Sequence, residues 1–163
     1  MAGKGDFAPA EWKKLLEAPL LAGFAISAAD PSGFIGTLQE AFASARALAE
    51  TKAGGADGLI KAVVDDLLTS SGRHDAREGV RTVVQGAQLA EMKDRALAEL
   101  KSTASILDAK APVEAKAFKS WLARIAKTVA ESGTEGGLFG FGGVKVSEIE
   151  KATLAQISTT LGV

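Results

Sequence analysis

Cysteine and tyrosine are absent from this chain of 163 residues, and histidine occurs once. Without cysteine the chain can form no disulfide, no cysteine-ligated metal centre and no thiol-based redox site. One histidine and the lack of any ligand motif argue against a transition-metal site, so we expect no metal and no cofactor. The net charge is −1, from 19 basic and 20 acidic residues, and it predicts no nucleic-acid partner.

Apolar runs long enough to cross a bilayer are also absent. The longest run, 18–29, contains Pro19 and Gly23, whereas a membrane-spanning helix needs about 20 apolar residues. The first residues, 1–12, are polar and lack the apolar core of a signal peptide. We therefore expect a soluble, cytoplasmic protein without a transmembrane segment.

Alanine, the strongest helix former, is unusually common, and no stretch alternates as a strand does. The fold class that follows is all-α: a compact bundle of about six to seven helices in a single domain, 1–163, with residues 1–7 as a loose arm. Pro19 lacks an N–H donor and predicts a kink or break in the first helix. Helical spacing predicts helices over 9–29, 34–48, 59–68, 74–85, 89–107, 113–130 and 147–161.

The segment 113–130 shows the strongest amphipathic pattern, and we expect the other helices to be organised around it. A wide apolar stripe with two aromatic rings needs other helices to cover it. Its predicted buried face comprises Val113, Phe118, Trp121, Leu122, Ile125 and Val129. Its predicted solvent face comprises Lys116, Lys119, Arg124 and Lys127.

Two parts of the chain resemble each other. The ten residues from Leu21 to Asp30 align with those from Leu122 to Glu131, with four identities, and each copy is followed by a Ser-Gly pair and a further helix. One interpretation is a duplicated helical hairpin. The other is that two alanine-rich helices are alike through composition alone.

The second copy also carries a family resemblance. A helix, an acidic residue, a glycine-containing loop and then Val-Ser-Glu-Ile-Glu-Lys-Ala-Thr-Leu-Ala-Gln-Ile resembles the hairpin of TerB-like (tellurite-resistance) proteins, over 118–162 and more weakly over 21–38. In this chain Glu131-Ser132-Gly133 and Asp30-Pro31-Ser32-Gly33 stand where that family usually has Ala-Asp-Gly. The chain is also similar to small bacterial helical proteins of uncharacterised function. Both resemblances imply an all-helical fold and no particular activity.

Three arginines form the first candidate site. Arg73, Arg77 and Arg81 are four residues apart, so one helix face would carry all three guanidiniums and could hold a phosphate or carboxylate. Alternatively, acids such as Glu78 neutralise the row and leave a solvated face. We expect His74 to be a surface residue, because no nucleophile motif accompanies it.

The glycine-rich stretch 136–143 is the second candidate. It lacks the Gly-Lys-Ser/Thr of a phosphate loop, and its apolar side chains are Leu138, Phe139 and Phe141. We expect these side chains to fold back onto the core. The alternative is an exposed patch for a protein partner, a homodimer mate or a membrane surface.

No catalytic constellation accompanies these features. We therefore expect a protein-interaction or small-ligand-binding module without catalytic activity, which could form a homodimer. One alternative is an enzyme with an unrecognised site near the arginines. The other is peripheral membrane association through 138–141.

Overall fold

The computed structural model describes residues 1–29, 58–132 and 146–163. Within these ranges no strand occurs, and the helices share a single hydrophobic core, which confirms the all-α, single-domain prediction. The predicted helix 34–48 and the loop residues Leu138, Phe139 and Phe141 lie outside the described residues. The described elements are η1 (Lys4–Asp6), α1 (Pro9–Ala29), α3 (Leu59–Leu67), α4 (Ser70–Val84), α5 (Leu89–Lys110), α6 (Pro112–Ser132) and α7 (Glu148–Leu161).

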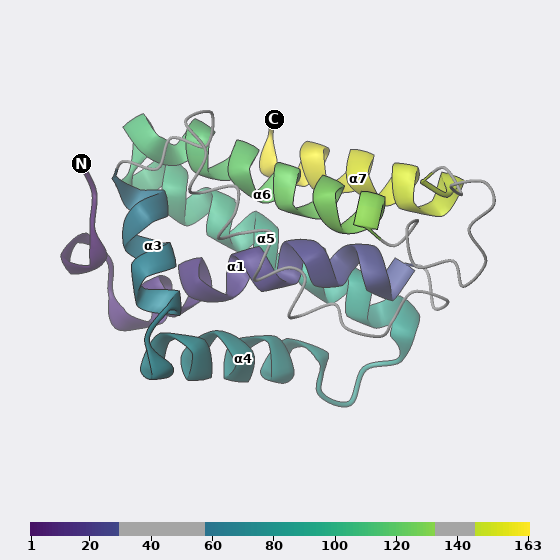
Figure 1. Cartoon of the computed structure of the whole chain (residues 1–163), viewed down its shortest axis with the longest axis horizontal. Coiled ribbons are helices and arrows are strands. Elements are labelled where there is room, and N and C mark those ends of the chain that lie inside the picture. The colour runs from purple at the N-terminus through teal and green to yellow at the C-terminus, as the bar shows by residue number, and fades with distance from the viewer. Residues whose placement is uncertain (30–57, 133–145) are drawn as a thin grey trace.

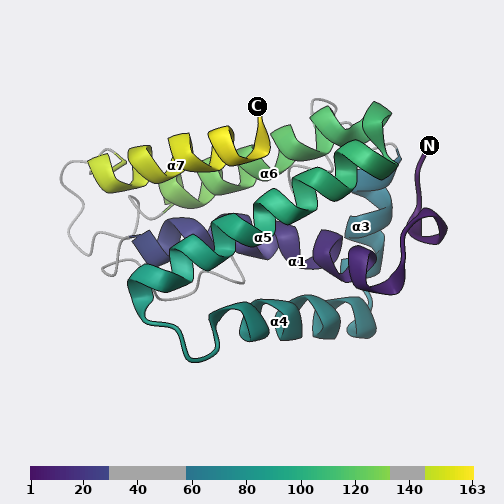
Figure 2. The same ribbon diagram turned by 180° about the vertical axis from the view of Figure 1, so that it is seen from behind.

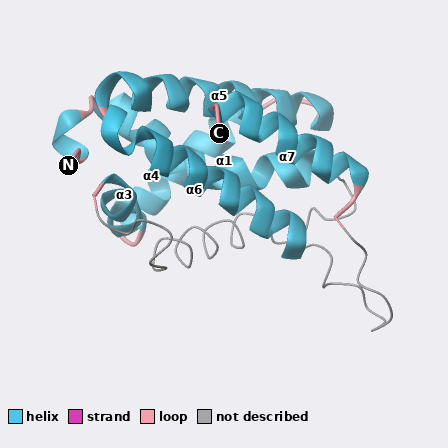
Figure 3. Cartoon of the chain, turned by 90° about the horizontal axis from the view of Figure 1, so that it is seen from above, coloured by secondary structure: helices cyan, strands magenta, loops and turns pink. Residues whose placement is uncertain are grey.

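Helix α1 runs through the middle of the bundle. It contacts α3, α4, α5, α6 and α7, most extensively α5. Figure 1 shows α6 and α7 on one side of α1 and α4 on the opposite side. Figure 2 shows α5 crossing α1 on the rear face, and Figure 3 shows the same helices from above. The bundle is therefore built around α1, and our expectation that 113–130 organises the fold is wrong.

The central position of α1 follows from its sequence. Every residue from Leu15 to Ala28 is buried, so the helix is covered on all sides rather than along one stripe. A helix that is apolar all round belongs in a core. Pro19 lies inside α1, which continues to Ala29, so of the predicted kink or break the break does not occur. Burial of apolar side chains on both sides of Pro19 outweighs the loss of one backbone hydrogen bond.

Helix α6 buries most of its predicted stripe. Phe118 and Trp121 are fully buried, and their rings meet edge to face with centroids 5.1 Å apart. Two assignments on this helix are wrong. Val113 is 90% exposed, because it lies in the first turn and points outward. Lys119 is buried, because its ammonium reaches across to Asp108 of α5, with Nζ 2.6 Å from Oδ1.

The N-terminal residues 1–7 are anchored, contrary to the predicted loose arm. Phe7 is buried against Trp12, with ring centroids 5.8 Å apart. Ala2 N donates to Glu114 Oε1 of α6 at 2.8 Å. Asp66 of α3 accepts hydrogen bonds from Lys4 Nζ at 2.9 Å and Trp12 Nε1 at 2.7 Å. The polar composition of the segment favours mobility. The partners that hold it in place lie far away in sequence, so composition alone does not reveal them.

Local capping explains where α7 begins and ends. A capping box begins the helix, because Ser147 Oγ accepts from Glu150 N at 3.2 Å and Glu150 Oε2 accepts from Ser147 N at 2.8 Å. Gly162 ends the helix with φ of 74°, in the left-handed region that glycine adopts without strain.

Helix α4 lies unusually close to its neighbours. It begins at Ser70 rather than at the predicted residue 74, because Thr69 caps it by accepting from Gly72 N at 2.9 Å. Its fully buried positions carry small side chains, Gly72, Ala76 and Val80. A Cβ at position 72 would lie only 2.1 Å from the Asp66 carbonyl oxygen. At the other end, Arg95 of α5 donates to the last carbonyls of α4.

Candidate functional site

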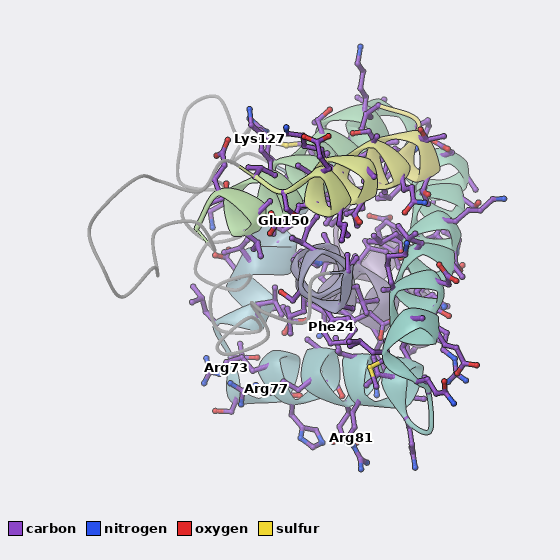
Figure 4. The ribbon with its side chains drawn as sticks, turned by 90° about the vertical axis from the view of Figure 1, so that its right-hand side faces the viewer. Phe24, Arg73, Arg77, Arg81, Lys127 and Glu150 are labelled. Atoms are coloured by element: carbon purple, nitrogen blue, oxygen red, sulfur yellow. The ribbon has the colours of Figure 1, made fainter. Side chains whose placement is uncertain are left out.

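The three predicted arginines lie along the outer edge of the molecule, away from Phe24 at the centre (Figure 4). Arg73 donates to the Leu68 carbonyl at the end of α3, with Nη1 2.6 Å from the oxygen. Arg81 forms an ion pair with Glu78, with Nη2 2.8 Å from Oε2. Two of the three guanidiniums are thus engaged within the protein. The anion-binding hypothesis stays a prediction.

The face of α4 that is turned toward α1 and α5 contains a pocket of about 340 Å³. It differs from the arginine row in that its polar groups come from three helices and converge. We call it the Glu17 pocket. Its lining residues are Ala10, Lys13, Lys14 and Glu17 of α1, Asp75, Glu78, Gly79, Thr82 and Val83 of α4, and Glu99 of α5.

Glu17 is the unusual member of this set. It is only 6% exposed, although it carries an ionisable carboxyl group. Helix α4 contacts this side chain at Gly79, where a Cβ would lie 1.8 Å from Glu17 Oε2 and 3.2 Å from Glu17 Cβ. The Glu17 side chain therefore occupies the space that any other residue at position 79 would need. Gly79 allows α4 to close over the carboxyl group.

Burial raises the pKa of Glu17 to about 7. The negative charge of Glu99 contributes to this rise, and the positive charge of Lys14 opposes it. Desolvation disfavours the charged form of a carboxyl group, so the neutral acid persists to a higher pH than it does in water. Glu17 therefore changes charge near neutral pH rather than near pH 4.5.

The neighbouring lysines are committed to other acids. Lys13 and Lys14 lie four and three residues before Glu17, a spacing at which helical side chains can pair. Instead, Lys13 Nζ lies 3.1 Å from Asp75 Oδ1 of α4, and Lys14 pairs with Glu99 of α5. Among the described residues, no hydrogen bond or ion pair engages the Glu17 carboxyl group.

Glu78, the remaining acid of the pocket, is also neutralised. Glu78 accepts hydrogen bonds from Arg81, and this contact lowers the pKa of Glu78. Asp75, Glu78 and Glu99 thus each have a cation within hydrogen-bonding distance. Glu17 is the carboxyl group at which the pocket can still accept positive charge.

The sequence contained two signals for this site. Glu17 interrupts an apolar segment between Leu16 and Ala18, where a charged side chain must meet the core. Gly79 lies inside a helix, where glycine is unfavourable by about 1 kcal/mol relative to alanine. Neither signal identifies the partner helix, so the two residues could not be brought together before the fold was known.

A second pocket has a similar volume, about 330 Å³. It lies where the end of α1 meets the beginnings of α5 and α7. Its charged lining residues are Lys93 and Asp94, and neither is buried. Volume does not separate the two pockets, but a buried ionisable group distinguishes the Glu17 pocket.

Comparison with known proteins adds no assignment: no family model, curated protein or solved structure matches this chain. The TerB-like resemblance therefore stays a prediction. In the described ranges, no set of three or more acidic or histidine side chains is arranged to hold a metal ion. None of the helices in those ranges combines the length and hydropathy that a membrane span requires.

Proposed function

We propose that this protein is a small-ligand-binding module without catalytic activity, and that its binding site is the Glu17 pocket. The observation that carries the proposal is a carboxyl group, nine-tenths buried, that lines a pocket and has no partner among the described residues. Buried polar groups in folded proteins are almost always hydrogen-bonded. A ligand that supplies the missing partner would explain why an ionisable group occupies this position.

The size and composition of the pocket support the proposal. A volume of about 340 Å³ lies at the lower end of the range for small-molecule sites, roughly 300–1,000 Å³. Such sites combine apolar walls with a few polar groups that set orientation. Here Ala10 and Val83 supply apolar surface, and the charged groups come from three different helices.

The experiment is a fragment titration followed by NMR. Neutral, acidic and basic compounds of about ten heavy atoms or fewer are added to the ¹⁵N-labelled protein, and amide shifts are measured. We expect saturable shifts that are largest in α1, α4 and α5 around Glu17. Shifts distributed over the whole surface, or confined to the second pocket, would contradict the proposal.

A matched pair of variants tests the location. Thr82 lines the Glu17 pocket and is exposed, and its hydroxyl donates to the Glu78 carbonyl at 2.8 Å. Ser105 of α5 is equally exposed and donates to the Lys101 carbonyl at 3.1 Å, but it does not line the pocket. Thr82→Phe should block binding, whereas Ser105→Phe should leave it unchanged. Equal binding by both variants would place the ligand elsewhere.

A further inference from the structure

We infer that the Glu17 pocket selects small organic monocations, ammonium or guanidinium groups on a short apolar chain, and that binding is linked to release of a proton from Glu17. This inference rests on the proposed function and names the ligand class of the same site. It depends on the charges that surround Glu17, on the pocket walls and on the position of Gly79.

The charge distribution selects a cation. The charged groups that face Glu17 are Lys13 and Lys14 of α1, Asp75 and Glu78 of α4, and Glu99 of α5. Lys13, Lys14 and Arg81 each form an ion pair with one acid of the pocket, so three of the four acids are neutralised. When Glu17 is ionised, no cation in the described ranges pairs with its charge. An incoming ammonium would supply that charge, whereas a carboxylate or phosphate would be repelled.

The pocket walls select an organic cation over a metal ion. Calcium and magnesium require several oxygen ligands around one point, and the described residues contain no such grouping. One carboxyl group beside Ala10, Val83 and the aliphatic stem of Lys14 instead suits a single charged head on a short hydrocarbon chain. Because position 79 is glycine, α4 packs directly against the Glu17 carboxyl group, where a Cβ would lie 1.8 Å from Oε2.

Proton release follows from the raised pKa of Glu17. A cation binds the ionised carboxylate, so a molecule in which Glu17 is neutral must lose its proton before or during binding. With a pKa of about 7, the affinity should rise about tenfold between pH 6 and pH 8 and change little above pH 8. An alkylammonium keeps its own charge over this range, as lysine side chains do.

The test uses four probes with short alkyl chains: butylammonium, butylguanidinium, butanol and butyrate. Affinities are measured by NMR titration of the 163-residue chain at pH 6, 7 and 8. We expect the two cations to bind at the Glu17 pocket, with the tenfold rise between pH 6 and pH 8. Butanol should bind more weakly and without pH dependence, and butyrate should not bind.

Two substitutions of the same kind provide the comparison. Glu17→Gln keeps the shape of the neutral side chain and removes the titration, so cation binding at pH 8 should fall at least tenfold and lose its pH dependence. Glu148→Gln removes an acid that is 89% exposed on α7 and should change nothing. The single histidine, His74, is replaced by Gln in a third variant, because histidines in general titrate between pH 5 and 8.

The outcomes separate the inference from the proposed function. Binding of butanol or butyrate at the pocket, in preference to the cations, would overturn the cation inference and leave the binding site standing. Unchanged cation binding in Glu17→Gln, or pH dependence that disappears with His74→Gln, would also overturn it. If no probe binds at the pocket and the fragment titration also finds nothing there, the proposed function itself fails.

Discussion

The substitution Glu17→Gln should stabilise this protein at neutral and alkaline pH. An ionisable group whose pKa is raised on folding binds more protons in the folded state than in the unfolded state. The stability that Glu17 contributes is therefore full below pH 4.5, is lost as pH rises toward 7, and stays lost above that value. Glutamine imitates the neutral acid at every pH, so the variant escapes this loss.

The magnitude follows from the two pKa values. A pKa unit corresponds to about 1.4 kcal/mol. A rise in pKa from 4.5 to about 7 therefore changes the contribution of Glu17 to the free energy of unfolding by about 3 kcal/mol between low pH, where it is protonated, and high pH, where it is ionised. Most of that difference, about 2.5 kcal/mol, falls between pH 5 and pH 8. For a domain of this size, it corresponds to a change in Tm of roughly 5–10 °C.

The assay is urea unfolding at several pH values between 5 and 8, followed by circular dichroism and by tryptophan fluorescence. Subtracting the free energy of unfolding of wild type from that of Glu17→Gln isolates the contribution of residue 17. The difference should grow with pH and level off near pH 8. The His74→Gln background removes the single histidine from the comparison.

Two results would refute this reasoning. If the difference between wild type and Glu17→Gln does not vary from pH 5 to pH 8, the Glu17 carboxyl group has an ordinary pKa and is not desolvated. If wild type gains stability relative to the variant as pH rises, the ionised form of Glu17 is favoured by folding. The ionised carboxylate would then require a paired group other than the described residues.

Three further substitutions test the packing by urea unfolding. Trp121→Ala should cost about 3–5 kcal/mol, because the ring is fully buried beside Phe118; a cost below about 0.5 kcal/mol would place the ring at the surface. Asp66→Ala should lower the free energy of unfolding by about 1.5–3 kcal/mol, since it leaves the buried Trp12 Nε1 without its acceptor. An equal loss of stability in the control Asp65→Ala, at an exposed position, would contradict this. Gly79→Ala should destabilise the protein by about 1–3 kcal/mol through overpacking. The stabilisation usual for alanine in a helix would show that the Glu17 side chain moves aside.

The sequence predicted the helices well because their signals are local. Helical spacing, the Ser147–Glu150 capping box and Gly162 depend on neighbours within a few residues. The prediction of 113–130 as the central helix is wrong, because a strong apolar stripe marks a helix that is buried on one side only. A helix that is apolar on every side has no stripe, yet the run 18–29 was itself the signal of a buried helix.

The errors on single residues have a common cause. Lys119 was assigned to the surface by its charge, but Asp108 of the preceding helix allows its ammonium to be buried. The N-terminal arm was expected to be loose, but Asp66 and Glu114 hold it in place. In each case the deciding partner belongs to another element, and spacing along one helix cannot identify it.

The candidate site shows the same limit more strongly. Lys13 and Lys14 lie on the same helix as Glu17, at a spacing that allows helical side chains to pair. The fold instead brings Asp75 and Glu99 to the two lysines, and no cation among the described residues pairs with Glu17. Its candidate role depends on which helices meet, and no local pattern specifies that.

The central claim, that Glu17 is a buried, proton-linked group at a ligand pocket, is tested most directly by the side-chain carboxyl ¹³C resonance of Glu17. Its NMR titration should give a pKa of about 7 in the free protein. A saturating amount of butylammonium should lower that value by at least one unit. A pKa near the ordinary 4.5 in the free protein, or one that butylammonium leaves unchanged at saturation, would contradict the account.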